Sequence, residues 1–134
     1  MAFKSAIEDA ERKMFEGKSG FLMKRGGRHG GVKSWNKRYC CLSKEGELGV
    51  LRWYYSKAHF TSTARGELVI SYDTNVTKEE VKGKGMCICI KNENEEPFYA
   101  MPESAASLSE WLSLLRLYSG DNMPTRDTFL PSFQ

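Results

Sequence analysis

The sequence predicts a mainly β fold, in which seven short antiparallel strands form a bent, partly closed barrel that one C-terminal α-helix caps. Two observations predict it. Between residues 20 and 101, apolar and polar side chains alternate in short runs separated by glycine-rich or acidic turns, a pattern typical of strands. After residue 104 the apolar period becomes that of an amphipathic helix. Curling the sheet and plugging one end with this helix removes the exposed edges and the uncovered end of an open sheet.

The length and composition indicate one domain. A hydrophobic content of 40% over 134 residues is too high for a disordered chain. No apolar run is long enough to span a membrane or to form a signal-peptide core. We expect a cytoplasmic protein with an N-terminal helical extension at 1–17, the domain itself at 18–120, and a C-terminal tail at 121–134.

Short alternating runs place the strands. We expect them at residues 20–24, 35–42, 48–55, 66–72, 74–82, 86–91 and 98–101. A turn with four glycines separates the first two strands, and the acidic stretch 92–97 separates the last two. The prediction of the fifth strand rests only on two apolar residues, Val76 and Val81.

Two helices are expected outside the strands. Residues 3–16 have an apolar face, and their acidic polar face favours packing on the side of the domain over docking on a membrane or a partner. Residues 104–119 place Leu108, Trp111, Leu112, Leu115 and Tyr118 on one face. Ser107 and Glu110 form a candidate capping box, and Gly120 is the expected stop.

Charge is distributed unevenly along the chain. Residues 18–44 hold eight Lys or Arg and no Asp or Glu. The other residues hold twelve Lys or Arg and seventeen Asp or Glu, a formal charge of −5, so the net +3 is the difference between a basic hairpin and an acidic body. The hairpin indicates where an anionic partner would dock, whereas the acidic body argues against nucleic acid.

Few residue patterns in the sequence indicate a catalytic or metal-binding site. Cys40 with Cys41 and Cys87 with Cys89 do not have the spacing of a zinc site, and adjacent strand residues point to opposite faces. We therefore expect free thiols and no metal. Neither of the two histidines lies near a carboxylate pair or a nucleophile, and no phosphate-loop motif occurs. We expect no enzymatic activity and no cofactor.

Five motifs occur in a characteristic order. They are G-F-L-M-K at 20–24, W-N-K-R-Y at 35–39, L-R-W-Y-Y at 51–55, R-G-E-L at 65–68, and a helix with a central Trp111. This set resembles the pleckstrin homology (PH) domain family over about residues 18–119. The resemblance implies a seven-stranded bent barrel capped by a C-terminal helix and, for a subset of members, binding of phosphoinositide headgroups at the loop between the first two strands.

The resemblance also implies a set of headgroup-binding residues. The positions that match the binding pattern are Lys24, Arg28, Lys33, Arg38, Tyr55 and Arg65. Asn36 departs from the pattern, because a further basic residue stands at this position in the subset that binds. Fewer cations would suit phosphatidic acid, whose headgroup is a small phosphomonoester.

The residues alone also favour a phosphate ligand. A phosphomonoester carries close to two negative charges and is held by converging cations and free backbone N–H groups, which the basic, glycine-rich turn offers. Around it, we expect Arg25, Val32, Trp35 and Lys37 to contact the membrane. Each basic residue near an anionic membrane surface strengthens membrane binding by about 1 kcal/mol of free energy.

Two functions from different classes follow. The first is membrane targeting through an anionic phospholipid, with the protein a monomer at the cytoplasmic face. The alternative is a protein-interaction module of the same fold that holds a peptide along an exposed strand edge.

Overall fold

The structure, a computed structural model, describes residues 17–26, 34–57 and 63–120. The expected helix at 3–16 and the tail at 121–134 lie outside the described residues. Arg28, Val32 and Lys33, in the loop between the first two strands, lie outside them as well.

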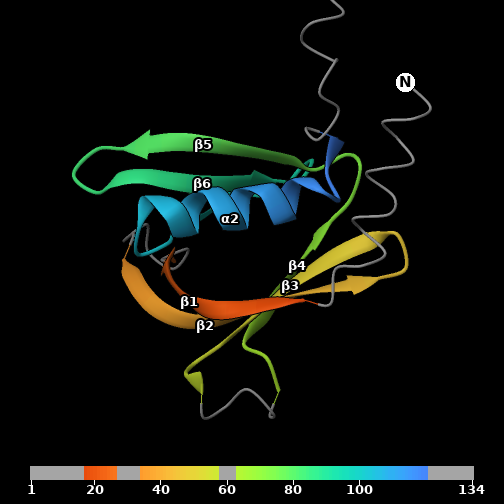
Figure 1. The fold of residues 1–134 in the computed structure, drawn as a ribbon, viewed down its shortest axis with the longest axis horizontal. Helices are drawn as coiled ribbons and strands as arrows, with labels where there is room; N and C mark the ends of the chain where they lie inside the picture. The colour runs from red at the N-terminus through yellow and green to blue at the C-terminus, as the bar shows by residue number, and fades with distance from the viewer. Residues whose placement is uncertain (1–16, 27–33, 58–62, 121–134) are drawn as a thin grey trace, which may run out of the picture.

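The described chain forms one antiparallel sheet and one C-terminal helix (Figure 1), which confirms the expected mainly β fold. In chain order the elements are β1 (Lys18–Arg25), β2 (Trp35–Glu45), β3 (Leu48–Tyr54), β4 (Gly66–Ile70), β5 (Asn75–Val81), β6 (Gly85–Lys91), β7 (Phe98–Met101) and α2 (Ala105–Arg116). The seven strands are ordered β4-β3-β2-β1-β7-β6-β5, so β1 joins the two halves of the sheet through β7.

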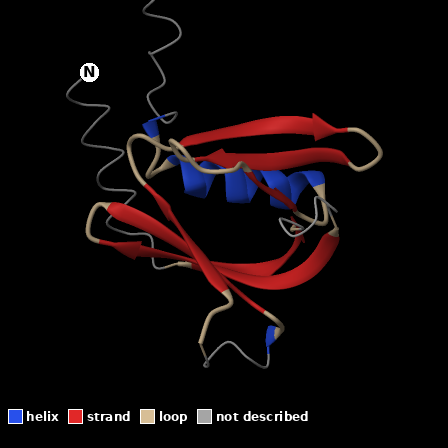
Figure 2. Cartoon of the chain, turned by 180° about the vertical axis from the view of Figure 1, so that it is seen from behind, coloured by secondary structure: helices blue, strands red, loops and turns tan. Residues whose placement is uncertain are grey.

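The sheet folds back over the helix. In Figure 1, α2 lies between the β5–β6 hairpin and the β1–β2 hairpin, and Figure 2 shows the same arrangement from behind. The last turn of the helix is tied to β5, because Arg116 Nε donates a hydrogen bond to the carbonyl oxygen of Val76 at 3.0 Å. The helix therefore closes one end of the bent sheet.

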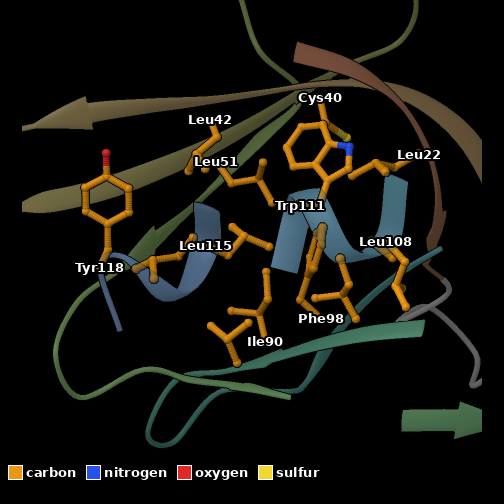
Figure 3. Close-up of a cluster of buried hydrophobic side chains, with 14 of the residues drawn as sticks. Leu22, Cys40, Leu42, Leu51, Ile90, Phe98, Leu108, Trp111, Leu115 and Tyr118 are labelled. Atoms are coloured by element: carbon orange, nitrogen blue, oxygen red, sulfur yellow. The ribbon is translucent and has the colours of Figure 1, made fainter. Parts of the chain in front are cut away.

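Trp111 is the centre of the core. It is 2% exposed and belongs to a buried cluster that draws side chains from both halves of the sheet. Figure 3 shows its indole pointing toward Cys40 and Leu22, with Phe98 on the opposite side. Burial raises the pKa of the Cys40 thiol to about 12, so this side chain remains a neutral part of the core.

The structure corrects the expected limits of the helix. Ser104 is the N-cap in place of Ser107, since its hydroxyl accepts a hydrogen bond from the Ser107 N–H at 3.1 Å. The helix ends at Arg116 and not near Gly120. Leu117 and Tyr118 follow the helix yet remain buried against the barrel, which explains why their apolar character imitates another helical turn.

Several strand limits also differ, because strand pairing decides where a strand ends. Lys18 pairs with Leu42, so β1 begins two residues before Gly20, and the β2–β3 pairing continues to Glu45 opposite Leu48. Conversely, β3 ends before Tyr55, and β4 ends two residues before Tyr72. The weakly predicted fifth strand is present as β5.

Gly49 allows the chain after α2 to pack on the sheet. A Cβ atom at this position would lie 2.6 Å from Cδ2 of Tyr118. We expect Gly49→Ala to lower the free energy of unfolding by about 1–3 kcal/mol, because the ring must move out of a packed site. Urea unfolding measures the effect. Gly26→Ala is the matched control, since no atom lies within 4 Å of its Cβ position; equal midpoints for the two variants would contradict the prediction.

Candidate functional site

An open hollow of about 690 Å³ lies where β1, β2, β3 and β4 meet the β6–β7 turn. Its basic lining residues are Lys24, Arg25, Arg38 and Arg65, and its acidic ones are Glu67, Glu95 and Glu96. Trp53 and Phe98 also line it. Three of the six residues expected to bind a headgroup therefore meet in one hollow.

Strand pairing places Lys24 and Arg38 on the inner face of the sheet. Arg38 pairs with Leu22 and Asn36 pairs with Lys24, and side chains of paired residues share a face. Because every second residue of a strand points the same way, Lys24 continues the side of buried Leu22. Arg38 likewise continues the side of buried Cys40, as expected from the sequence.

Two aromatic rings hold the Lys24 ammonium in the hollow. Its Nζ lies 4.8 Å from the ring centroid of Trp53 and 5.3 Å from that of Phe98. The two rings are themselves 5.1 Å apart. A cation over an aromatic face is attracted by the ring quadrupole, so the charge is directed over this aromatic pair.

Gly66 makes room for the aromatic pair. A Cβ atom at this position would lie 2.3 Å from Cζ2 of Trp53, closer than any side chain tolerates. The glycine of the R-G-E-L motif is therefore required because the Trp53 ring lies directly on the backbone of β4.

Tyr55 joins the two arginines of the site. The guanidinium carbon of Arg38 is 5.2 Å and that of Arg65 5.6 Å from the Tyr55 ring centroid. Arg38 Nη1 also donates a hydrogen bond to the carbonyl oxygen of Lys37 at 2.9 Å. One ring, 59% exposed, thus brings together two cations from β2 and from the segment before β4.

The described residues expected to contact a membrane lie on the outer face. Arg25 pairs with Trp35, and its guanidinium lies 4.0 Å from the Tyr99 ring centroid. Lys37 Nζ lies 4.7 Å from the Phe21 ring centroid. Arg25 also lines the hollow, whereas Trp35 and Lys37 do not. Arg28, Val32 and Lys33 lie outside the described residues, so their positions stay predictions.

Two acidic residues of the hollow are not identified by sequence reasoning. Glu95 and Glu96 lie in the turn between β6 and β7 and line the hollow from that side. The acidic turn is visible in the sequence, but its proximity to Lys24 depends on the pairing of β7 with β1. Glu67, by contrast, pairs with Arg52, with Nε and Oε1 3.1 Å apart.

Other chemical features of the described residues are limited. All four cysteines are free thiols, and burial raises the pKa of each. In residues 17–26, 34–57 and 63–120, no group of three His, Cys, Asp or Glu side chains is arranged to hold a metal ion. Among the same residues, no helix has the length and apolar character needed to cross a membrane.

The sequence matches the PH domain family over residues 16–119, and the chain belongs to this family. The C-terminal PH domain of pleckstrin, solved in complex with D-myo-Ins(1,2,3,5,6)P5, is 19% identical with a TM-score of 0.59, and the match covers 75% of this chain and 91% of that chain. The PH domain of human oxysterol binding protein-related protein 11 is 18% identical with a TM-score of 0.56, covering 75% and 78%. At sequence identities of 18% and 19%, the similarity to these two structures establishes the shared fold alone. A comparison with curated proteins finds no match.

Proposed function

We propose that this PH domain targets membranes by binding the phosphate of an anionic phospholipid, a phosphoinositide or phosphatidic acid, in the hollow. The observation that carries the proposal is the convergence of Lys24, Arg38 and Arg65 from three separate segments on one open hollow. Charge-assisted hydrogen bonds from several cations are the strong contacts that a phosphate accepts. Lysine supplies a compact charge, whereas each arginine supplies a planar fork.

In this proposal, the other predicted residues have supporting roles. Tyr55 keeps Arg38 and Arg65 beside each other, since both guanidinium groups lie near its ring. Arg28 and Lys33 contribute further cations from the loop between β1 and β2. The inositol pentakisphosphate complex of the pleckstrin domain supports the proposal, because it shows a domain of this fold with a phosphorylated inositol bound.

The outer face would contact the lipid surface beside the headgroup. Arg25 and Lys37 bring positive charge to this face, and Trp35 brings an amphipathic ring that suits the interface. Val32, between β1 and β2 in the sequence, would add apolar contact. The protein would then be a monomeric, non-enzymatic module at the cytoplasmic surface of a membrane.

A second candidate function rests on the sheet edges. Strands β4 and β5 are the two ends of the sheet order, and an extended peptide adds to such an edge through backbone hydrogen bonds. This alternative requires neither the basic hollow nor a lipid, so vesicle binding distinguishes the two functions.

Co-sedimentation with vesicles tests the proposed function. We compare phosphatidylcholine vesicles that carry phosphatidic acid or a phosphoinositide with vesicles in which phosphatidylserine supplies the same total charge. We expect binding to the phosphomonoester lipids to persist at physiological ionic strength, because several cations contact one phosphate. Phosphatidylserine binding should disappear, since diffuse attraction is screened beyond about 8 Å. Equal binding to all charge-matched vesicles would reject headgroup recognition, and no binding to any would favour the peptide-binding alternative.

A further inference from the structure

We propose that the start of β4 is part of the ligand site, and that the backbone N–H of Glu67 donates a hydrogen bond to the bound phosphate. The inference rests on the proposed function and adds a backbone donor to its cations. Three features of the barrel support it. They are the seam in which the hollow lies, the free edge of β4 at this seam, and the β-bulge at which β4 begins.

The hollow lies where the end strand β4 curls back toward the β6–β7 turn. Three strands separate β4 from β7 in the sheet order. Residues 65–68, at the start of β4, nevertheless line the same hollow as residues 95–98, which lead into β7. Further along β4 this seam is closed, because Asn92 Nδ2 donates a hydrogen bond to the carbonyl oxygen of Val69 at 2.9 Å. The hollow is therefore the part of the seam that remains open.

The backbone of Glu67 faces the open part of the seam. In an antiparallel pair, the N–H and C=O of one residue point to the same side, and successive residues point to opposite sides. The carbonyl of Val69 points away from β3 to reach Asn92, so Glu67, two residues earlier, directs its own N–H and C=O the same way. β4 is last in the order of the described strands, and within the described part of the chain no acceptor bonds the Glu67 N–H.

The side chain of Glu67 lies on the other face of the strand. Glu67 is opposite Arg52 in the register, and its Oε1 is 3.1 Å from Arg52 Nε. Arg52 belongs to the outer face, because it alternates with Leu51 and Trp53, which pack in or against the core. The carboxylate is thus held outside, and the part of Glu67 that lines the hollow is its backbone. A phosphate in the hollow meets the N–H, and the C=O beside it accepts a water or a hydroxyl.

A β-bulge adds Arg65 to the same wall. Gly66 pairs with Trp53, yet the N–H of Arg65 also bonds to the Trp53 carbonyl oxygen at 2.9 Å, so two residues lie opposite one. Strict alternation would place Arg65 on the outer face, but a bulge redirects a side chain, and Arg65 lines the hollow. The start of β4 therefore offers a guanidinium and a backbone N–H to one anion. Lys24 and Arg38 approach the same hollow from the β1–β2 hairpin.

The test removes the backbone donor with proline, which an edge strand tolerates where the N–H lies outside the ladder. Glu67→Pro is compared with Glu67→Ala, which loses the carboxylate and its contact with Arg52 but retains the N–H. Val69→Pro is the matched control, since its N–H points to the same edge and Val69 does not line the hollow. Affinities are measured for vesicles with phosphatidic acid or a phosphatidylinositol monophosphate, and for soluble glycerol phosphate and inositol phosphate. Thermal unfolding shows whether each variant is folded.

We expect Glu67→Pro to bind at least about tenfold more weakly than Glu67→Ala, the effect of one hydrogen bond to a charged group. Val69→Pro should retain the wild-type affinity within about twofold. An equal loss for vesicles and for soluble phosphates would assign the contact to the phosphate of either source. A loss on vesicles alone would assign it to the lipid headgroup.

A measurement on the wild-type protein tests the same contact without a substitution. In amide NMR spectra of the nitrogen-labelled protein, titration with glycerol phosphate or inositol phosphate should move the Glu67 amide proton downfield and leave the Val69 amide in place. Saturable binding with an unmoved Glu67 amide, or equal affinities of Glu67→Pro and Glu67→Ala, would overturn this inference alone. If the wild-type protein binds none of the vesicles or soluble phosphates, the proposed function fails together with it.

Discussion

Replacing Trp111 with alanine is expected to lower the free energy of unfolding by about 3–5 kcal/mol, the cost of removing a large buried aromatic side chain. Trp111 is 2% exposed and lies between the two halves of the sheet, so the cavity would open where the helix closes the barrel. Small domains are stable by only about 5–15 kcal/mol, so this loss is a large part of the total. Urea unfolding followed by far-ultraviolet circular dichroism measures it.

Ser113→Ala is the matched control for this prediction. Ser113 lies on the same helix but is exposed, so its replacement should change stability by no more than about 0.5 kcal/mol. If the Trp111 variant unfolded at the same urea concentration as the Ser113 variant, α2 would not be the element that holds the two halves of the sheet together.

The double variant Lys24→Gln/Arg38→Gln is expected to lose about 100-fold in affinity for vesicles with a phosphomonoester headgroup. A hydrogen bond to a charged group contributes about 1.5–3 kcal/mol, so each residue accounts for at least about tenfold. Glutamine retains much of the side-chain length and removes the charge. Co-sedimentation over a range of lipid concentrations gives the affinities, and thermal unfolding shows whether the variant remains folded.

The matched control removes two positive charges away from the hollow. Lys44 lies at the far end of β2, opposite Gly49, and Lys78 lies on the edge strand β5. Neither lines the hollow. Lys44→Gln/Lys78→Gln should keep most of the binding. If both double variants lost affinity equally, attraction would depend on total charge, and the hollow would not be the binding site.

The strands could be predicted well because their signal is local. A period of two in β1, β2 and β6 follows directly from the alternation of side chains across a strand. The ends of elements were predicted less well. Ser104 and Ser107 both have residue types that cap helices, and only the backbone geometry decides between them. The apolar residues Leu117 and Tyr118 continue the helical pattern because burial, and not helix formation, requires their side chains.

The sequence by itself determined the strand order in the chain, the closing helix with Trp111, and the basic β1–β2 hairpin in which Lys24 and Arg38 share the core-facing side. Each of these follows from residues that are close in the chain, or from a period that pairing preserves. Only the tertiary structure decided that Arg65 approaches Arg38 over Tyr55, that Lys24 lies over Trp53 and Phe98, and that Glu95 and Glu96 line the same hollow as the cations. These contacts join segments distant in sequence. The pairing of β2, β3 and β4 brings Tyr55 and Arg65 to Arg38, whereas the pairing of β7 with β1 brings Phe98 and the glutamates to Lys24.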